Sequence, residues 1–145
     1  MAQVVRFTRA LSNTMVTDIQ TALDAGSGAM TINLYDGTMP ATPETGISSQ
    51  VLLATCPSSS STVCATQTGG TSTFAAITTA TAEAFSGSPR TATWARFATS
   101  AGVGAGAVFD CNVGVVGSGS FIEMITTSIV ASGPVAFTSG SITFP

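Results

Sequence analysis

From residue 29 onward, apolar and polar residues alternate in short runs that end at glycine, serine or proline. Such alternation is typical of β-strands with one buried face. We expect strands at 30–35, 51–54, 74–85, 91–98, 107–113, 121–130 and 135–144. No interval repeats along the chain, so a solenoid or propeller is not expected. The pattern predicts one mainly β domain, a single β-sandwich or partly open β-barrel of six to eight strands.

One N-terminal amphipathic helix is expected before the strands, over about residues 9–25. Apolar side chains recur there at four-residue steps and, with two on neighbouring positions, are predicted to form its buried stripe: Leu11, Met15, Ile19 and Leu23, with Val16 and Ala22. Thr8 or Ser12 can cap its first turn, and the glycines at 26 and 28 can end it. Residues 8–145 are therefore predicted to form a single β-rich domain that begins with this helix.

Two of the expected strands carry more specific predictions. The run 121–130 has apolar residues on both of its faces, which predicts a strand covered on both sides. In the last segment, the apolar positions change from odd to even numbers across Ser139 and Gly140. Such a change predicts a bulged strand, with the β-bulge at the glycine.

The first seven residues have no evident hairpin partner. Val4, Val5 and Phe7 are apolar and precede the helix, so residues 1–7 are predicted to be an N-terminal arm or an edge strand. As an arm, they can add a strand to a neighbouring subunit, and Val4, Val5 and Phe7 would then form an interface. As an edge strand, they would pair within their own domain.

The composition excludes several classes of function. Charged residues make up only 8% of the chain, the net charge is −3, and all four cations are arginines, so no basic surface for nucleic acid is expected. The chain has no histidine, which removes histidine-based catalytic triads and ordinary catalytic zinc sites. No run of eighteen apolar residues is present, so no membrane span is expected. We expect a non-enzymatic protein with no metal and no cofactor.

Two further sequence patterns resemble catalytic or phosphate-binding motifs, but neither supports an enzyme or a cofactor site. Asp110 and Glu123 could be a carboxylate pair on neighbouring strands, but each stands in an ordinary strand or turn context. The glycines at 102, 104 and 106 follow a strand but precede another strand, whereas a phosphate-binding loop opens a helix. These glycines predict a flexible turn.

The three cysteines, at positions 56, 64 and 111, allow two interpretations. An odd number without a secretory signal favours reduced, partly buried thiols. Alternatively, Cys56 and Cys64 flank a short serine-rich loop, and a hairpin there could bring them together as a disulfide. Such a bond would add roughly 2–3 kcal/mol of stability.

Trp94 and Arg96 share one face of the strand expected at 91–98. A lone tryptophan on a strand favours a core anchor, although an exposed one could stack on sugars. The Arg96 guanidinium could pair with Asp110 as a structural ion pair. We therefore interpret Trp94 and Arg96 as structural anchors.

Several segments, taken in order, resemble a family of small structural proteins encoded by tailed bacteriophages. They span nearly the whole chain and are TALDAGSG, TINLYDGTMPATP, VLLATC, TATWARFATSAG and TTSIVASGPVAFTSGSITFP. The resemblance implies a virion component without enzymatic activity, made in the host cytoplasm. The cysteine loop and the acid-poor surface depart from the usual pattern of the family.

Physical arguments favour the outside of the capsid among the possible places in the virion. A small hydroxyl-rich β domain with an apolar docking segment suits a decoration (cement) protein that binds the shell in many copies. Its expected partners are the major capsid protein or other virion subunits, and further copies of itself in a homo-oligomer. The alternatives are a tail or neck component and a carbohydrate-binding host-attachment module that uses Trp94.

Overall fold

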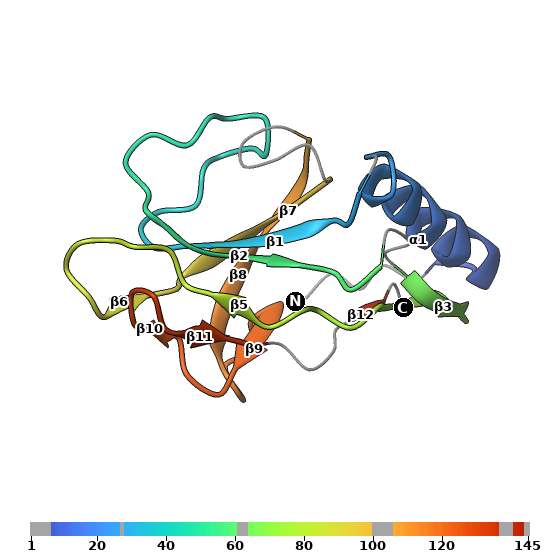
Figure 1. The fold of residues 1–145 in the computed structure, drawn as a ribbon. Helices are drawn as coiled ribbons and strands as arrows, with labels where there is room; N and C mark the ends of the chain where they lie inside the picture. The colour runs from blue at the N-terminus through green and yellow to red at the C-terminus, as the bar shows by residue number, and fades with distance from the viewer. Residues whose placement is uncertain (1–6, 27, 61–63, 100–105, 137–140, 144–145) are drawn as a thin grey trace.

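The computed structural model describes residues 7–26, 28–60, 64–99, 106–136 and 141–143, with only the backbone at 64–68 (Figure 1). The described residues form one helix and twelve short strands. They are α1 (Arg9–Leu23), β1 (Thr31–Tyr35), β2 (Leu52–Pro57), β3 (Cys64–Thr68), β4 (Thr71–Phe74), β5 (Ala80–Thr81), β6 (Arg90–Thr91), β7 (Trp94–Ala98), β8 (Ala107–Val115), β9 (Ile122–Met124), β10 (Ser128–Ile129), β11 (Pro134–Val135) and β12 (Ser141–Thr143). The mainly β fold with one N-terminal helix is confirmed.

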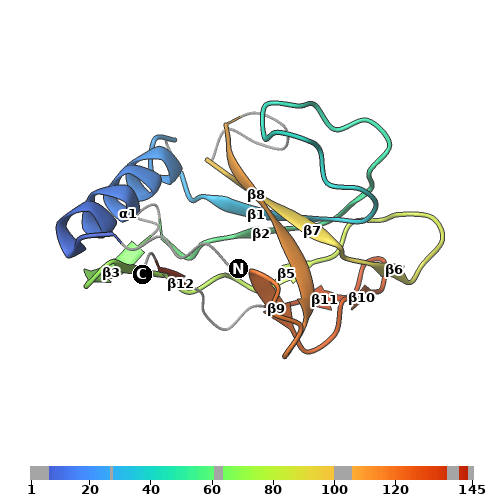
Figure 2. The ribbon, with the colours of Figure 1, turned by 180° about the vertical axis from the view of Figure 1, so that it is seen from behind.

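The largest unit is a curled five-stranded sheet with the order β2-β1-β7-β8-β9. Its neighbouring strands are antiparallel except β8 and β9, which are parallel. Three small sheets accompany it, β10-β6, β11-β5 and β12-β4-β3. Figure 1 and Figure 2 show α1, β3 and β12 toward one end of the molecule and β6, β10 and β11 toward the other.

The core lies between one face of the five-stranded sheet and the small sheets. The sheet contributes buried side chains such as Leu34, Phe97 and Val113, and the small sheets contribute Phe74, Ile129, Val135 and Ile142. Phe97 stacks on Phe109 with ring centroids 4.3 Å apart and also contacts Phe74 and Phe121. Beside this aromatic cluster, a hollow of about 230 Å³ is lined by Ile19, Phe109, Phe121 and Ile142.

The opposite face of the sheet is polar and aromatic. Cross-strand register aligns Asn33, Arg96 and Asp110 in one row and Tyr35, Trp94 and Asn112 in the next. The long connection between β1 and β2, residues 36–51, reaches this face, where the Thr45 carbonyl accepts a hydrogen bond from Arg96 and the Asp36 carbonyl accepts one from Trp94. This contact allows a tryptophan and an arginine to be buried on a sheet face outside the core.

The helix begins where the sequence predicts, but its buried stripe differs from the expected one. Thr8 is the N-cap, and its side chain accepts a hydrogen bond from the Leu11 N–H. The buried helical residues are Ser12, Val16 and Leu23, whereas Leu11 is 46% exposed. Each four-residue step turns about 40° around a helix with 3.6 residues per turn, so Leu11 and Leu23 lie about 120° apart. The prediction of Leu11 in the stripe was therefore wrong.

The run 121–130 is not one strand covered on both sides. It divides into β9 and β10, and Phe121, Ile125 and Val130 are exposed. The chain turns between the two strands, where the Thr126 hydroxyl accepts a hydrogen bond from the Ser128 N–H at 3.1 Å. The residue pattern predicted a strand longer than the backbone forms here, and these three apolar side chains remain uncovered.

The last segment is also divided. β11 pairs with β5, and β12 pairs with β4 in a different sheet, so a single strand from Val135 to Phe144 does not form. Both Val135 and Ile142 are buried, in agreement with the change of parity between them. The bulge predicted at Ser139 and Gly140 lies outside the described residues.

Candidate interaction surface

Four exposed aliphatic side chains lie around the connection between β9 and β10. They are Val115, Val116, Ile125 and Val130, and Ile125 is 95% exposed. The Val116 N–H donates to the Met124 carbonyl, which places the end of β8 beside Ile125. Ile125 and Val130 line the same pocket. We call these four residues and that pocket the β9–β11 surface.

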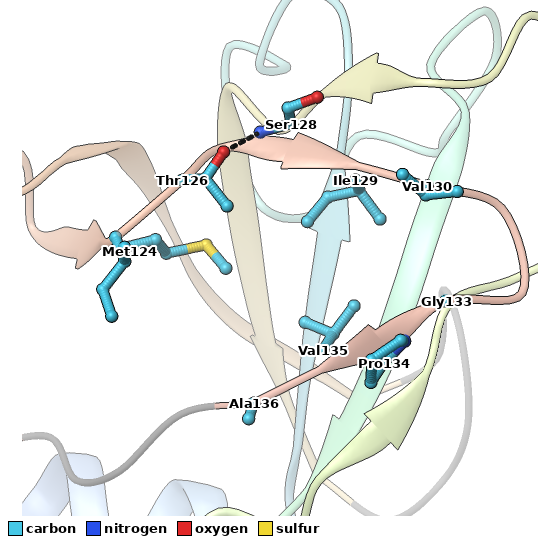
Figure 3. A pocket seen from close by; sticks show the side chains of 10 residues that line it. Met124, Thr126, Ser128, Ile129, Val130, Gly133, Pro134, Val135 and Ala136 are labelled. Carbon is cyan, nitrogen blue, oxygen red and sulfur yellow. Dashed lines mark hydrogen bonds between the residues drawn. The ribbon is translucent and has the colours of Figure 1, made fainter.

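The pocket lies between β10 and β11 and has a volume of about 230 Å³ (Figure 3). Figure 3 shows the Ile129 and Val135 side chains pointing toward the space between these two strands. The lining is mostly apolar and contains no charged side chain: Met124, Ile125, Thr126, Ser128, Ile129, Val130, Gly133, Pro134, Val135 and Ala136.

A tight turn between β10 and β11 forms one end of the pocket. Ser132 has a φ of +59°, and the Gly133 N–H donates to the Val130 carbonyl at 2.9 Å. A Cβ at position 133 would lie 2.9 Å from that same carbonyl oxygen, closer than real side-chain carbons approach backbone. Glycine at this position therefore lets the two strands approach each other at the turn.

One acid beside this surface, Glu123, is bound by its own loop. Glu123, on the exposed face of β9, accepts hydrogen bonds from the N–H groups of Gly117 and Gly119 at 3.0 and 2.8 Å. These bonds lower the pKa of Glu123, and they hold the tight connection between β8 and β9. Gly117 and Gly119 have φ values of +84° and +75°, which glycine adopts without strain.

A second exposed apolar area lies at the start of the helix. Phe7 and Leu11 are both exposed there. Val4 and Val5, the other members of the predicted interface, lie outside the described residues. Whether residues 1–7 act as an arm or as an edge strand stays a prediction.

The predicted Arg96–Asp110 pair is present and buried. Arg96 Nε and Nη2 donate to the two carboxylate oxygens of Asp110 at 2.7 and 2.8 Å, and the Arg96 side chain is 1% exposed. The bonds to Asp110 raise the pKa of Arg96, so the guanidinium stays protonated at ordinary pH values. The guanidinium carbon also lies 5.6 Å from the Trp94 ring centroid.

Trp94 is a buried anchor, as predicted, and offers no exposed platform for a sugar. It is 1% exposed and stacks on Tyr35 with ring centroids 4.5 Å apart. Burial raises the pKa of the Tyr35 phenol. The basis for a sugar-binding role of Trp94 was exposure of its ring, which the structure does not provide.

Asp110 and Glu123, the possible carboxylate pair, each have another partner. Asp110 is bound to Arg96, and Glu123 is bound to backbone amides. Burial raises the pKa of the Cys56 and Cys111 thiols to about 12, so neither is a nucleophile at neutral pH. Within the described ranges, no three histidine, cysteine or acidic side chains form a group that could hold a metal ion.

Cys56 and Cys111 are buried free thiols, as the first interpretation predicts, and the alternative hairpin between Cys56 and Cys64 does not form. β2, which holds Cys56, pairs with β1, whereas β3, which begins at Cys64, pairs with β4 in another sheet. Cys56 is a free, buried thiol. The Cys64 side chain lies outside the described part of the chain, so its bonding state stays a prediction.

Comparisons of this chain with protein-family models, with curated proteins and with solved structures found no match. Among the described residues, no helix has both the length and the apolar character needed to cross a membrane. The β9–β11 surface was not predicted from the sequence, because the run 121–130 was expected to be covered on both of its faces. The run 121–130 itself carries the signal for this surface. It has apolar residues on both faces, and no predicted element was available to cover the second face.

Proposed function

We propose that this chain is a non-enzymatic structural protein of a tailed-phage virion, and specifically a capsid decoration protein that binds the outer shell as a homo-oligomer. The observation that carries this proposal is exposed apolar surface on a chain with very few charges. Among the residues that the structure describes, such areas include the β9–β11 surface and the helix start with Phe7 and Leu11. Contiguous exposed apolar surface marks sites of protein contact.

The chain has only eleven charged residues, and four of them are paired with each other. Arg96 pairs with Asp110, and Arg90 pairs with Asp36. Few charged side chains therefore remain for ion pairs with a partner, and attachment is expected to depend on apolar burial. The proposed partners are the major capsid protein or other virion subunits, and the proposed location is the virion after synthesis in the host cytoplasm.

The arrangement of the sheets supports a more specific description of the fold. The five-stranded sheet curls around the core, and the small sheets face it across the shared buried side chains. We propose that the fold is a partly open β-barrel or a β-sandwich. Its role is to hold both apolar areas on a rigid body.

Salt should not remove the protein from its particle, whereas deletion of residues 1–7 should weaken attachment. Raising salt from about 0.05 to 1 M shortens the Debye length from above 10 Å to about 3 Å, which would release a contact made of ion pairs. Deletion removes three apolar side chains, and burial of even one is worth about 1.5–3 kcal/mol, so affinity should fall at least about tenfold.

The measurement is binding of purified protein to particles that lack it, at both salt concentrations. The deletion keeps Thr8 and the whole of α1, so circular dichroism should show an intact fold. Met39→Ser, which changes an exposed apolar residue in the 36–51 connection, is the matched control and should bind normally. Release of the full-length protein by salt alone, or full binding by the truncated protein, would contradict this mode of attachment.

A further inference from the structure

The β9–β11 surface has a protruding side chain and a hollow next to each other. Ile125 is almost fully exposed, and it stands at the edge of the pocket between β10 and β11. A single exposed aliphatic residue is ordinary on a protein surface. Here, however, Ile125 and Val130 both line an apolar hollow, and the exposed Val115 and Val116 lie at the end of β8 beside Met124.

The size and lining of the pocket favour a side chain over a small molecule. Its volume of about 230 Å³ is below the range of roughly 300–1,000 Å³ that is usual for small-molecule sites. None of its lining residues is charged, so it lacks the groups that orient most polar ligands and cofactors. An aliphatic side chain of another protein meets both conditions.

We propose that the occupant is Ile125 of a second copy of this chain, in a contact related by a two-fold axis. In such a contact the same surface appears on both partners, so each copy would place its Ile125 in the pocket of the other. A two-fold contact also brings identical charges together, which is costly for a charged surface. This surface has none among its pocket residues, and its neighbour Glu123 is bound by the N–H groups of Gly117 and Gly119.

The size of the surface sets the expected strength of the contact. The pocket residues with Val115 and Val116 number about a dozen, against roughly 20–30 residues on each side of a standard interface. We therefore expect a weak dimer, with a dissociation constant of about micromolar or higher. Such a contact would be populated where copies are crowded together, which links this interface to the structural role proposed above.

The first test is sedimentation velocity of the isolated full-length chain over about 5–500 μM, a range chosen around that dissociation constant. The unsubstituted protein should shift from monomer to dimer, and Ile125→Asp should raise the dissociation constant at least about tenfold, because it places a charge in an apolar pocket. Met39→Asp, the matched control on a distant loop, should dimerise normally. A monomer at all concentrations, or a dimer unaffected by Ile125→Asp, would overturn the proposal.

A second test identifies the geometry. Ile125→Cys and Val130→Cys proteins are prepared separately, mixed and exposed to a mild oxidant. Both positions are exposed, so folding should be unaffected. The two-fold contact predicts a disulfide between the cysteine introduced at position 125 of one variant and the cysteine introduced at position 130 of the other, and the unsubstituted protein should not form a dimer linked in this way. If this disulfide is absent at concentrations where the dimer is present, the proposed arrangement is wrong. Neither test uses a particle, so failure here leaves attachment to the particle to be judged by its own experiment.

Discussion

Replacing Asp110 with alanine should lower the free energy of unfolding by about 3–5 kcal/mol. The substitution leaves the Arg96 guanidinium buried with two of its donors, Nε and Nη2, unpaired. Its remaining bond, from Nη1 to the Thr45 carbonyl at 3.2 Å, cannot replace a carboxylate. The measurement is urea-induced unfolding at neutral pH, followed by tryptophan fluorescence, because the single tryptophan, Trp94, lies beside Arg96.

The partly exposed ion pair offers a matched control. Arg90 pairs with Asp36, but its side chain is 30% exposed, so Arg90→Ala should cost no more than about 1 kcal/mol. The double variant Arg96→Met, Asp110→Leu should recover most of the loss, since well-packed apolar residues often replace a buried pair without penalty. A cost for Asp110→Ala as small as that for Arg90→Ala would show that Arg96 reaches solvent.

Replacing Phe97 with alanine should cost about 3–5 kcal/mol, because it removes a fully buried ring and leaves a cavity. Phe97 stands at the centre of the aromatic cluster, stacked on Phe109 and in contact with Phe74 and Phe121. For a chain of this size, each kcal/mol corresponds to roughly 2–4 °C in melting temperature. The midpoint of thermal unfolding should therefore fall by at least about 6 °C.

Phe121 is the matched control for this prediction. It belongs to the same cluster and is also a phenylalanine, but it is 48% exposed. Phe121→Ala should therefore cost about half as much or less. Equal costs at positions 97 and 121 would mean that Phe121 is covered in the folded protein, which would contradict the exposed face of β9.

Some of the fold and site could be predicted from single residues and strict alternation. Thr8 marks the start of α1, and the alternation around Trp94 places Arg96 on the face where Asp110 meets it. Such features depend on neighbours along one strand or one helical turn, which the order of residues reveals directly. The buried ion pair and the single helix follow from them.

Other features depend on what covers a given face, which local patterns do not reveal. The run 121–130 has apolar residues on both faces, and only the tertiary arrangement leaves Ile125 outside. β3 has too few apolar residues to be recognised as a strand, and its pairing with β4 decides its conformation. The β9–β11 surface was missed for this reason, and the alternative cysteine hairpin does not form because β2 and β3 lie in different sheets.

The most direct test of the proposed function is the number of copies of this chain on purified phage particles, measured by quantitative mass spectrometry against the major capsid protein. A decoration protein bound across the shell should be present in hundreds of copies per particle. A count of about a dozen would instead indicate a tail or neck component, and absence of the chain from washed particles would contradict a structural role in the virion.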